Sequence, residues 1–248
     1  MIYQKRAVFL ISVLFFVSSF FMSMFNEIPS FSSISSIFII IFAIPSYYAL
    51  ISHLGNRKGL IVIIILSILP VLIEGFAVWT GFPYGGFEYG SRLGWLLFGL
   101  VPPTVSFAYL PILLCSLYVA SQYTKKIALF SLIAAIFNLL VDLVIDPAAV
   151  HIGFWSYTYG GLYFRVPLSN FLGWLVTGAI YAAIFYQISG NESLPLPSGT
   201  SVSLIWILSF WTGYLLIEKL YLPAIVGFAL VTYLIQKYRI NNKKMGEN

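Results

Sequence analysis

Long apolar runs alternate along the chain with short connections that are either polar or rich in aromatic residues and glycine. Runs of spanning length occupy residues 7–25, 31–52, 60–80, 103–121, 127–145, 168–188, 201–218 and 221–237. Each is close to the ~20 residues that a helix needs to cross about 30 Å of hydrocarbon. The pattern predicts an all-α, polytopic membrane bundle of about eight transmembrane helices with aromatic, glycine-rich outer loops. We expect residues 1–248 to form a single integral membrane domain.

Two parts of this pattern allow more than one interpretation. The first run follows Lys5 and Arg6 as a signal peptide would, but it is long and no small-residue cleavage site follows it. We therefore expect a retained helix. The last two runs are separated by Glu218 and Lys219, with Pro223 close behind, so they could form two helices, one bent helix or a re-entrant pair.

Composition supports a lipid environment, because 60% of the residues are hydrophobic and only 8% are charged. The connections on the side of the N-terminus carry ten of the 13 basic residues, namely Lys5, Arg6, Arg57, Lys58, Lys125, Lys126, Lys237, Arg239, Lys243 and Lys244. Only Arg92, Arg165 and Lys219 lie on the other side. The positive-inside rule then predicts a multi-pass protein of the cell membrane with both termini cytoplasmic. The net charge of +5 needs no nucleic acid to explain it.

The sequence contains few residues suited to metal or cofactor chemistry. Cys115 is the single cysteine, so no disulfide framework, iron–sulfur cluster or zinc ligand set can be formed from cysteines. His53 falls at a predicted helix end and His151 in a predicted outer loop, and we expect both to be solvated or capping residues. A dinucleotide-binding glycine fingerprint, a P-loop and a histidine-rich cluster are absent. We therefore expect neither a metal nor a cofactor.

Residues 138–147, NLLVDLVIDP, place an amide and two carboxyl groups inside an apolar run. Asn138, Asp142 and Asp146 drift by about 40° per step on a helix, so they share one face over about 12 Å. An Asp at the centre of a membrane helix costs about 2.5–3.5 kcal/mol, so this face should point into the bundle or a cavity. Because Pro147 follows Asp146, we expect the helix to end or restart there. The alternative roles are structural: an N-cap for Asp146, a helix-packing hydrogen bond for Asp142.

Residues 74–86 and 146–161 resemble each other: each begins with an acid, reaches Gly-Phe seven residues later and ends in Tyr-Gly-Gly. Beyond them, Val101-Pro102 can be matched to Val166-Pro167, which we prefer, or Gly94-Trp95 to Gly173-Trp174. The preferred register predicts a parallel repeat with Glu74 and Asp146 at similar depth near the outer face. Convergent composition of two outer loops is the alternative. The alternative role for Glu74 itself is structural, as a partner of Arg92 or Arg165.

Aromatic residues crowd the two connections at 82–89 and 154–164. Tyr and Trp commonly anchor membrane proteins at the lipid interface. Their rings also stabilise cations, by about 0.5–2 kcal/mol each, without reacting with them. An acid beside an aromatic wall is what carbocation chemistry requires.

In these residues the chain resembles the carotenoid hydratase family of membrane proteins. The resembling motifs are Thr80-Gly81-Phe82-Pro83-Tyr84-Gly85, Val101-Pro102, Asp142-x-x-x-Asp146-Pro147, Gly153-Phe154-Trp155, Tyr163 and Val166-Pro167-Leu168-x-Asn170-Phe171-x-Gly173-Trp174. They cover roughly residues 70–180, where we expect the catalytic core. The chain departs from the family pattern at Tyr109, where a Trp is expected, and at Arg165, where a small residue is expected.

The resemblance implies an enzyme that adds water to the terminal isopropylidene double bond of an acyclic C40 or C50 carotenoid. It implies acid catalysis through a tertiary carbocation, since a desolvated carboxyl group can keep its proton near neutral pH. The expected partners are a lipophilic carotenoid, the lipid bilayer and other enzymes of carotenoid biosynthesis. The candidate catalytic residues are Asp146, Asp142 and Glu74, and the candidate substrate-binding residues are Asn138, Trp79, Tyr84, Trp155, Tyr163, Arg165, Asn170 and Trp174.

Asp146 is the preferred proton donor for two reasons. It lies nearest the aromatic loop, and a charged carboxylate at a helix C-terminus would oppose the macrodipole. If a helix restarts at this point, the dipole argument reverses and Glu74 becomes the better donor.

Two other functions would also use carboxyl groups inside the membrane. A membrane prenyltransferase would use Asn138, Asp142 and Asp146 as half of a magnesium diphosphate site, but only Glu74 and Glu218 remain in the other helices for the second half. A transporter or proton relay would need polar residues that continue to the cytoplasmic side, and the runs LIVIIILSI and IALFSLIAA offer little beyond serine.

Overall fold

The computed structural model describes residues 5–21 and 31–244, and over these ranges the fold is helical. Eight α-helices are present: α1 (Lys5–Ser18), α2 (Phe31–Leu54), α3 (Asn56–Thr80), α4 (Val105–Ser121), α5 (Ile127–Ile152), α6 (Leu168–Ser189), α7 (Val202–Ile217) and α8 (Tyr221–Lys244). Short 3-10 turns η2 (Ser91–Leu93), η3 (Asn191–Ser193) and η4 (Ser198–Ser201) lie between them, as do two strands, β1 (Phe87–Tyr89) and β2 (Trp155–Tyr157). Five helical segments are long and apolar enough to cross a membrane, which identifies a membrane protein.

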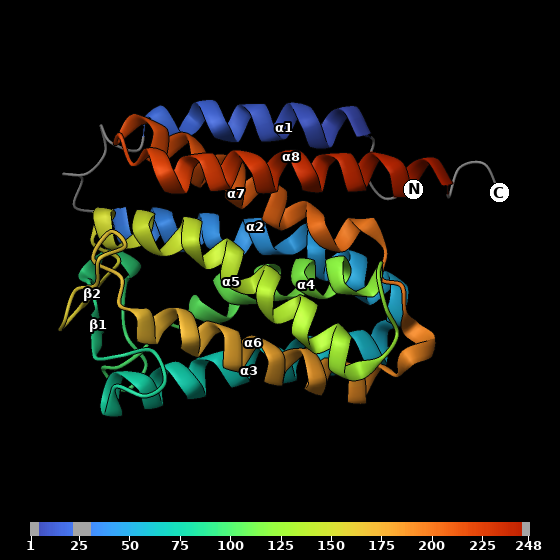
Figure 1. Ribbon diagram of the computed structural model, residues 1–248, viewed down its shortest axis with the longest axis horizontal. Helices are drawn as coiled ribbons and strands as arrows, with labels where there is room; N and C mark the ends of the chain where they lie inside the picture. The colour runs from blue at the N-terminus through green and yellow to red at the C-terminus, as the bar shows by residue number, and fades with distance from the viewer. Residues whose placement is uncertain (1–4, 22–30, 245–248) are drawn as a thin grey trace.

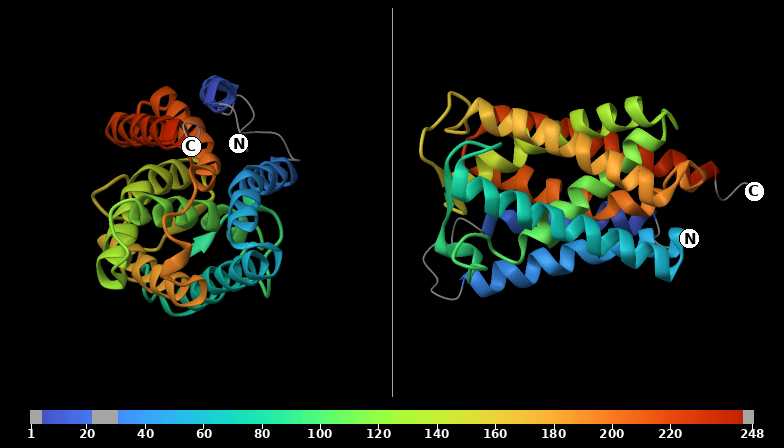
Figure 2. Two further views of the ribbon diagram at one scale, coloured as in Figure 1. Left: turned by 90° about the vertical axis from the view of Figure 1, so that its right-hand side faces the viewer. Right: turned by 90° about the horizontal axis from the view of Figure 1, so that it is seen from below.

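The helices run up and down along one long axis (Figure 1). The start of α1 and the end of α8 lie at one end of the bundle, and the two strands lie at the opposite end. The end-on view in Figure 2 shows α1, α7 and α8 grouped on one side of the remaining helices. The connections that carry the aromatic residues are therefore gathered at the end of the bundle away from the first and last described residues.

α4 is the central helix. Residues 109–121 are all buried, as is Val105 at its start. A helix that is apolar on every side is buried in this way, because it has no face to present to water. α2, α3, α5, α6 and α7 pack against it, and α5 also makes extensive contact with α6.

The prediction that the fifth helix ends or restarts at Asp146 is wrong. α5 continues through Pro147 to Ile152 and then ends at Gly153, which adopts a left-handed conformation at φ 79°. Proline lacks the N–H that would bond to the carbonyl four residues earlier, here that of Leu143. The hydroxyl of Tyr163 donates to this carbonyl oxygen at 2.9 Å. This long-range contact satisfies the Leu143 carbonyl and lets the helix continue.

The first apolar run and the last two runs, which the sequence left open, are all helical where the structure describes them. The last pair forms two separate helices, α7 and α8, which pack against each other. Between them Lys219 has a φ of 60°, and the N–H of Leu220 donates to the carbonyl of Leu215 at 2.8 Å, the bond that closes a helix in a Schellman motif. The first run is helical from Lys5 to Ser18, and its predicted last residues, 22–25, lie outside the described residues.

The two aromatic connections meet in a two-stranded antiparallel ribbon, in which Phe87 pairs with Tyr157 and Tyr89 with Trp155. Because side chains alternate along a strand, these four aromatic residues share one face. Glu88 and Ser156, between them, are exposed. We refer to Phe87, Tyr89, Trp155 and Tyr157 as the aromatic ribbon.

Both connections also contain a similar left-handed turn before the next helix. A bridge between Leu97 and Val101 encloses Phe98 and Gly99, whose φ angles are 52° and 73°. A bridge between Tyr163 and Val166 encloses Phe164 and Arg165, whose φ angles are 49° and 68°. The matching turns agree with the register that pairs Val101-Pro102 with Val166-Pro167.

Candidate active site

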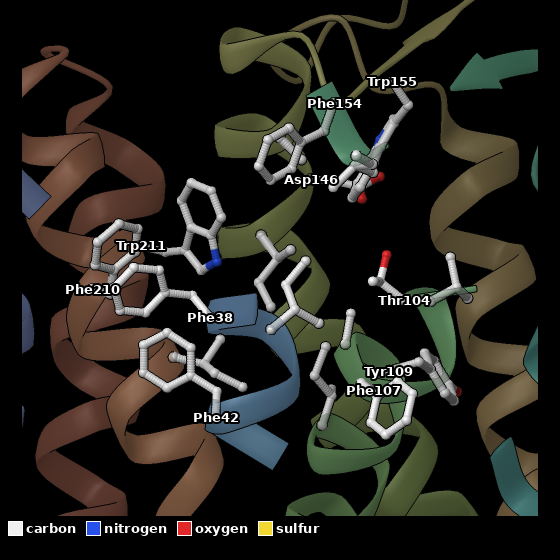
Figure 3. A pocket seen from close by; sticks show the side chains of 18 of the residues that line it. Phe38, Phe42, Thr104, Phe107, Tyr109, Asp146, Phe154, Trp155, Phe210 and Trp211 are labelled. Carbon is white, nitrogen blue, oxygen red and sulfur yellow. The ribbon is translucent and has the colours of Figure 1, made fainter. Parts of the chain in front are cut away.

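A cavity of about 650 Å³ lies inside the bundle beside the aromatic ribbon. Its lining is overwhelmingly aromatic and aliphatic, and it comes from α1 to α7 as well as from the ribbon. Figure 3 shows Asp146 beside Phe154 and Trp155 on one side of it, with Phe42, Phe210 and Trp211 on another and Tyr109 opposite. The cavity thus combines a carboxyl group with an apolar wall.

The polar face of α5 supplies the acids, as the four-residue spacing predicts. Asn138 and Asp142 are completely buried, and Asp146 is 1% exposed. Asp146 lines the cavity, and Asp142 and Asn138 lie one and two turns earlier in the helix, behind the cavity wall. The face points into the bundle and away from lipid, as expected for intramembrane carboxyl groups.

Asn170, in the first turn of α6, joins the two aspartates. Its side-chain amide donates to Asp142 Oδ2 at 2.9 Å and to Asp146 Oδ2 at 2.6 Å. Asn170 is itself 2% exposed and reaches the cavity. A single amide therefore holds the two carboxyl groups close together.

Tyr157 of the aromatic ribbon provides the second donor to Asp146. Its hydroxyl donates to Asp146 Oδ2 at 2.7 Å. Burial, and after it the nearby Asp146 carboxyl group, raise the pKa of Tyr157 above its ordinary value. The phenol therefore stays protonated and remains a hydrogen-bond donor at neutral pH.

Glu74 brings a third carboxyl group to the same cavity from α3. It is partly accessible because it faces the cavity, and it is close enough to Asp146 for their charges to interact. The described residues that line the cavity include no Lys, Arg or His. Simultaneous ionisation of neighbouring carboxyl groups is unfavourable in such a site, because no lining cation compensates their charges.

Further polar side chains extend behind the acids. The amide of Asn138 donates to the hydroxyl of Tyr109 at 3.0 Å, and the hydroxyl of Tyr84 donates to Thr177 Oγ1 at 3.1 Å. Burial, as the largest cause, raises the pKa of Tyr84 above its ordinary value. Asn138 Oδ1 and Asp142 Oδ1 are buried with no hydrogen-bond partner among the described residues. Buried polar atoms of this kind usually bind water or a ligand.

Gly173 of α6 is needed for this packing. A Cβ atom at Gly173 would lie 2.5 Å from Cδ1 of Tyr84, closer than side chains approach. The glycine thus lets the Tyr84 ring pack between the aromatic connection and α6.

The structure brings most of the predicted site residues together. Six of them line the cavity: Glu74, Tyr84, Asp146, Trp155, Asn170 and Trp174. Asn138 and Asp142 lie behind its wall, and Tyr163 contacts the backbone of α5. Trp79, which is 78% exposed, and Arg165, also exposed, lie outside the cavity.

Several residues of the site were not predicted. Tyr157 could have been found, because Phe-Glu-Tyr at 87–89 and Trp-Ser-Tyr at 155–157 both show the alternation of a strand with one aromatic face. The aromatic residues that α2 and α7 contribute, such as Phe42 and Trp211, carry no such signal. In an apolar run a cavity-lining ring looks the same as a lipid-facing one.

Among the described residues, no three His, Cys, Asp or Glu side chains converge as a metal site requires. The site is instead a carboxyl cluster in an aromatic cavity within a bundle of membrane helices. This combination defines a membrane protein with acidic side chains beside an apolar cavity in its interior.

Comparison with known proteins identifies the family. The family described as "Carotenoid biosynthesis protein" matches residues 34–234, and the chain belongs to it. A relative named bisanhydrobacterioruberin hydratase, from Haloarcula japonica, is 39% identical over 140 residues, which are 53% of this chain and 46% of the relative. The chain therefore matches about half the length of that protein. No solved structure matches the chain.

Proposed function

We propose that this protein hydrates the terminal carbon–carbon double bond of an acyclic carotenoid, with Asp146 as the proton donor. One observation carries the proposal: two donors, Tyr157 and Asn170, hold the Asp146 carboxyl group at the wall of an aromatic cavity. The relative with hydratase in its name supports the same reaction class. C40 or C50 carotenoids with an isopropylidene end are the proposed substrates.

The hydrogen bonds on Asp146 suit a general acid. Both donors bind Oδ2, where they stabilise the negative charge that forms as the proton leaves. The same Asn170 amide holds the Asp142 carboxyl group close to that of Asp146. Ionisation of one of them therefore disfavours ionisation of the other, so the pair keeps a proton at neutral pH. The site can therefore both retain a proton and release it.

The reaction then needs only a proton, water and shelter for a cation. The alkene π electrons form a C–H bond with the Asp146 proton at the less substituted carbon, which leaves a tertiary cation at the other carbon. The aromatic ribbon stabilises this cation. Water forms the C–O bond and returns a proton to the carboxyl cluster, so the product is a tertiary alcohol and the enzyme is unchanged.

Glu74 is suited to orient the water, because it faces the cavity from α3 and can accept a hydrogen bond from a water molecule placed next to the cation. Asp142 lies behind the cavity wall and acts on the reaction through its shared hydrogen bond to Asn170. Because α5 continues beyond Asp146, the helix dipole no longer gives a reason to prefer Asp146 as the proton donor. The hydrogen bonds that Asp146 Oδ2 accepts provide that reason instead.

The test is expression in a host that makes lycopene or a C50 acyclic carotenoid, with pigments analysed by mass. The expected pigments are heavier by one or two waters, and their oxygen comes from labelled water with no added cofactor. An unchanged pigment profile with several acyclic substrates, despite verified membrane insertion, would refute hydration. Label from O₂, or a need for a reductant, would indicate a hydroxylase.

A proton relay is less well supported by the same residues. The polar face of α5 stops at Asn138, and the next residues on that face, Ala134 and Phe130, are buried and apolar. A relay would need polar groups that continue toward the far end of the bundle. A prenyltransferase would need a second acidic cluster to hold magnesium and diphosphate.

A further inference from the structure

Three side chains belong both to the cavity and to the outer surface of the bundle. Leu14 of α1 and Phe38 of α2 line the cavity and are 62% and 49% exposed. Phe21, just after α1, also lines it and is 54% exposed. The cavity wall at this place is therefore only one side chain thick.

The seam between α1 and α2 is closed by side chains and not by helix packing. α1 packs along α7, and α2 packs against α3, α4 and α7. Across the seam the ring of Phe15 lies on that of Phe42, with centroids 4.6 Å apart. Rotation of such rings can open a passage without moving a helix, because rotamer changes are fast and local.

The outer surface around the seam is apolar. On α1 the exposed residues include Phe9, Leu10 and Val13, and on α2 they include Ile37 and Ile41. These faces suit contact with lipid chains. A molecule that leaves the cavity through the seam would thus enter the hydrocarbon of the bilayer and not water.

The cavity, of about 650 Å³, is in the range of pockets that enclose drug-sized ligands. A C40 polyene fills a comparable volume, but it is a rigid, extended rod about as long as the ~30 Å hydrocarbon thickness of a bilayer. Such a rod cannot fold back on itself, so if one end reaches Asp146 the rest of the chain extends outward past Leu14 and Phe38, which line the wall and are exposed.

We propose that the seam between α1 and α2 is a lateral entrance through which a linear polyene enters from the bilayer, end first. The terminal group reaches Asp146, the next part of the chain lies against Phe42 and Phe38, and the remainder stays in lipid. The inference rests on the proposed function for the identity of the substrate. It adds the route of entry and a binding subsite for the apolar chain.

Chemical modification after membrane assembly tests the entrance without affecting folding. Leu14→Cys in the full-length chain is reacted with a bulky maleimide such as pyrenylmaleimide. Leu10→Cys is the matched control, because Leu10 lies one turn earlier on α1, is 64% exposed and does not line the cavity. The native Cys115 is completely buried, and unsubstituted protein treated with the reagent checks that it does not react.

Modification at position 14 should lower the conversion of a C40 acyclic carotenoid by about tenfold or more, since a blocked entrance limits every turnover. Modification at position 10 should leave conversion within about twofold. A C10 or C15 acyclic isoprenoid with the same terminal group should be less affected at position 14 than the carotenoid. Equal conversion of the carotenoid before and after modification at position 14 would overturn the entrance.

A second readout separates this inference from the proposed function. The amount of carotenoid that copurifies with the protein should fall when position 14 is modified before the pigment is supplied. If unmodified protein hydrates nothing but this loss of binding is seen, the entrance stands and hydration fails. If hydration occurs and binding is unchanged by the modification, the entrance fails and hydration stands.

Discussion

At the scale of single residues, the carboxyl group of Asp146 depends on two distant parts of the chain. Tyr157 comes from the aromatic ribbon and Asn170 from the start of α6. These donors fix the orientation of the carboxyl group and stabilise its charged form. A general acid needs both properties at the moment of transfer.

Asp146→Asn should lower hydration by about 10²- to 10⁴-fold, the usual cost of removing a general acid. The amide keeps the shape of the side chain, so the protein should still insert and bind pigment. Glu88→Gln is the matched control, because Glu88 lies on the exposed face of the ribbon. Product is quantified by mass in membranes with equal amounts of protein. Full activity in Asp146→Asn would refute the assignment of the donor but not the hydratase.

Tyr157→Phe should lower the hydration rate by about 10- to 100-fold, because a hydrogen bond to a charged group contributes about 1.5–3 kcal/mol. The effect should appear in the rate and not in the binding of pigment, since the ring remains in the cavity wall. Tyr159→Phe serves as the control, since Tyr159 is 83% exposed two residues further on. An equal loss of pigment binding and rate would mean that Tyr157 acts only in packing.

At the scale of the elements, Pro147 and Tyr163 together explain why α5 is longer than predicted. Pro147 removes one helical hydrogen bond, and the Tyr163 hydroxyl supplies a donor to the Leu143 carbonyl in its place. Asp146 is therefore held inside a continuous helix. Its position relative to Asn170 depends on that continuity.

Tyr163→Phe should destabilise the protein by about 1–3 kcal/mol, because it leaves a backbone carbonyl without its donor. In a Pro147→Ala background the loss should be smaller, since residue 147 regains an N–H that can bond to Leu143. The two changes should therefore show a coupling energy of about 0.5–3 kcal/mol in a double-mutant cycle. Thermal unfolding in detergent measures it. Strictly additive losses would show that the Tyr163 hydroxyl does not replace the missing bond.

The sequence predicts the parts of the site that depend on local periodicity, but not the parts that depend on contacts between distant elements. The spacing of Asn138, Asp142 and Asp146 was sufficient to place them on one inward face, because helical periodicity is local. The end of α5 could not be predicted, because it depends on Tyr163, which is 16 residues beyond Pro147. The contribution of α1, α2 and α7 to the cavity depends on packing, which an apolar run does not encode in its own pattern.

At the scale of the whole molecule, the fold separates the basic residues from the aromatic site. The connection at 122–126 lies at the end of the bundle where α1 begins and α8 ends, and the aromatic ribbon lies at the other (Figure 1). Ten of the 13 basic residues belong to the first of these ends. This distribution argues for an orientation with the carboxyl cluster nearer the outer face.

A reporter fused after Lys126 should therefore be cytoplasmic, and one inserted near Gly160 should be external. The physical reason is that Lys and Arg near helix ends are retained on the cytoplasmic side during insertion. Reporter activity in cells, with an epitope-accessibility assay as the second measurement, reads the orientation. The reverse pattern would place the carboxyl cluster near the cytoplasmic face.

The proposed function and the proposed lateral entrance together predict the order in which products appear. A symmetrical acyclic carotenoid has two reactive ends, but only one of them reaches Asp146 at a time, because a rigid linear polyene cannot bring both ends to one carboxyl group of the cavity. The second end must enter after the first has left through the lipid-facing seam. A time course with purified protein in liposomes should therefore show the singly hydrated pigment first and the doubly hydrated pigment after a lag. With carotenoid in large excess over protein, the singly hydrated pigment should be the main early product. A doubly hydrated pigment formed without free intermediate would mean that both ends react in one binding event, which this cavity does not accommodate.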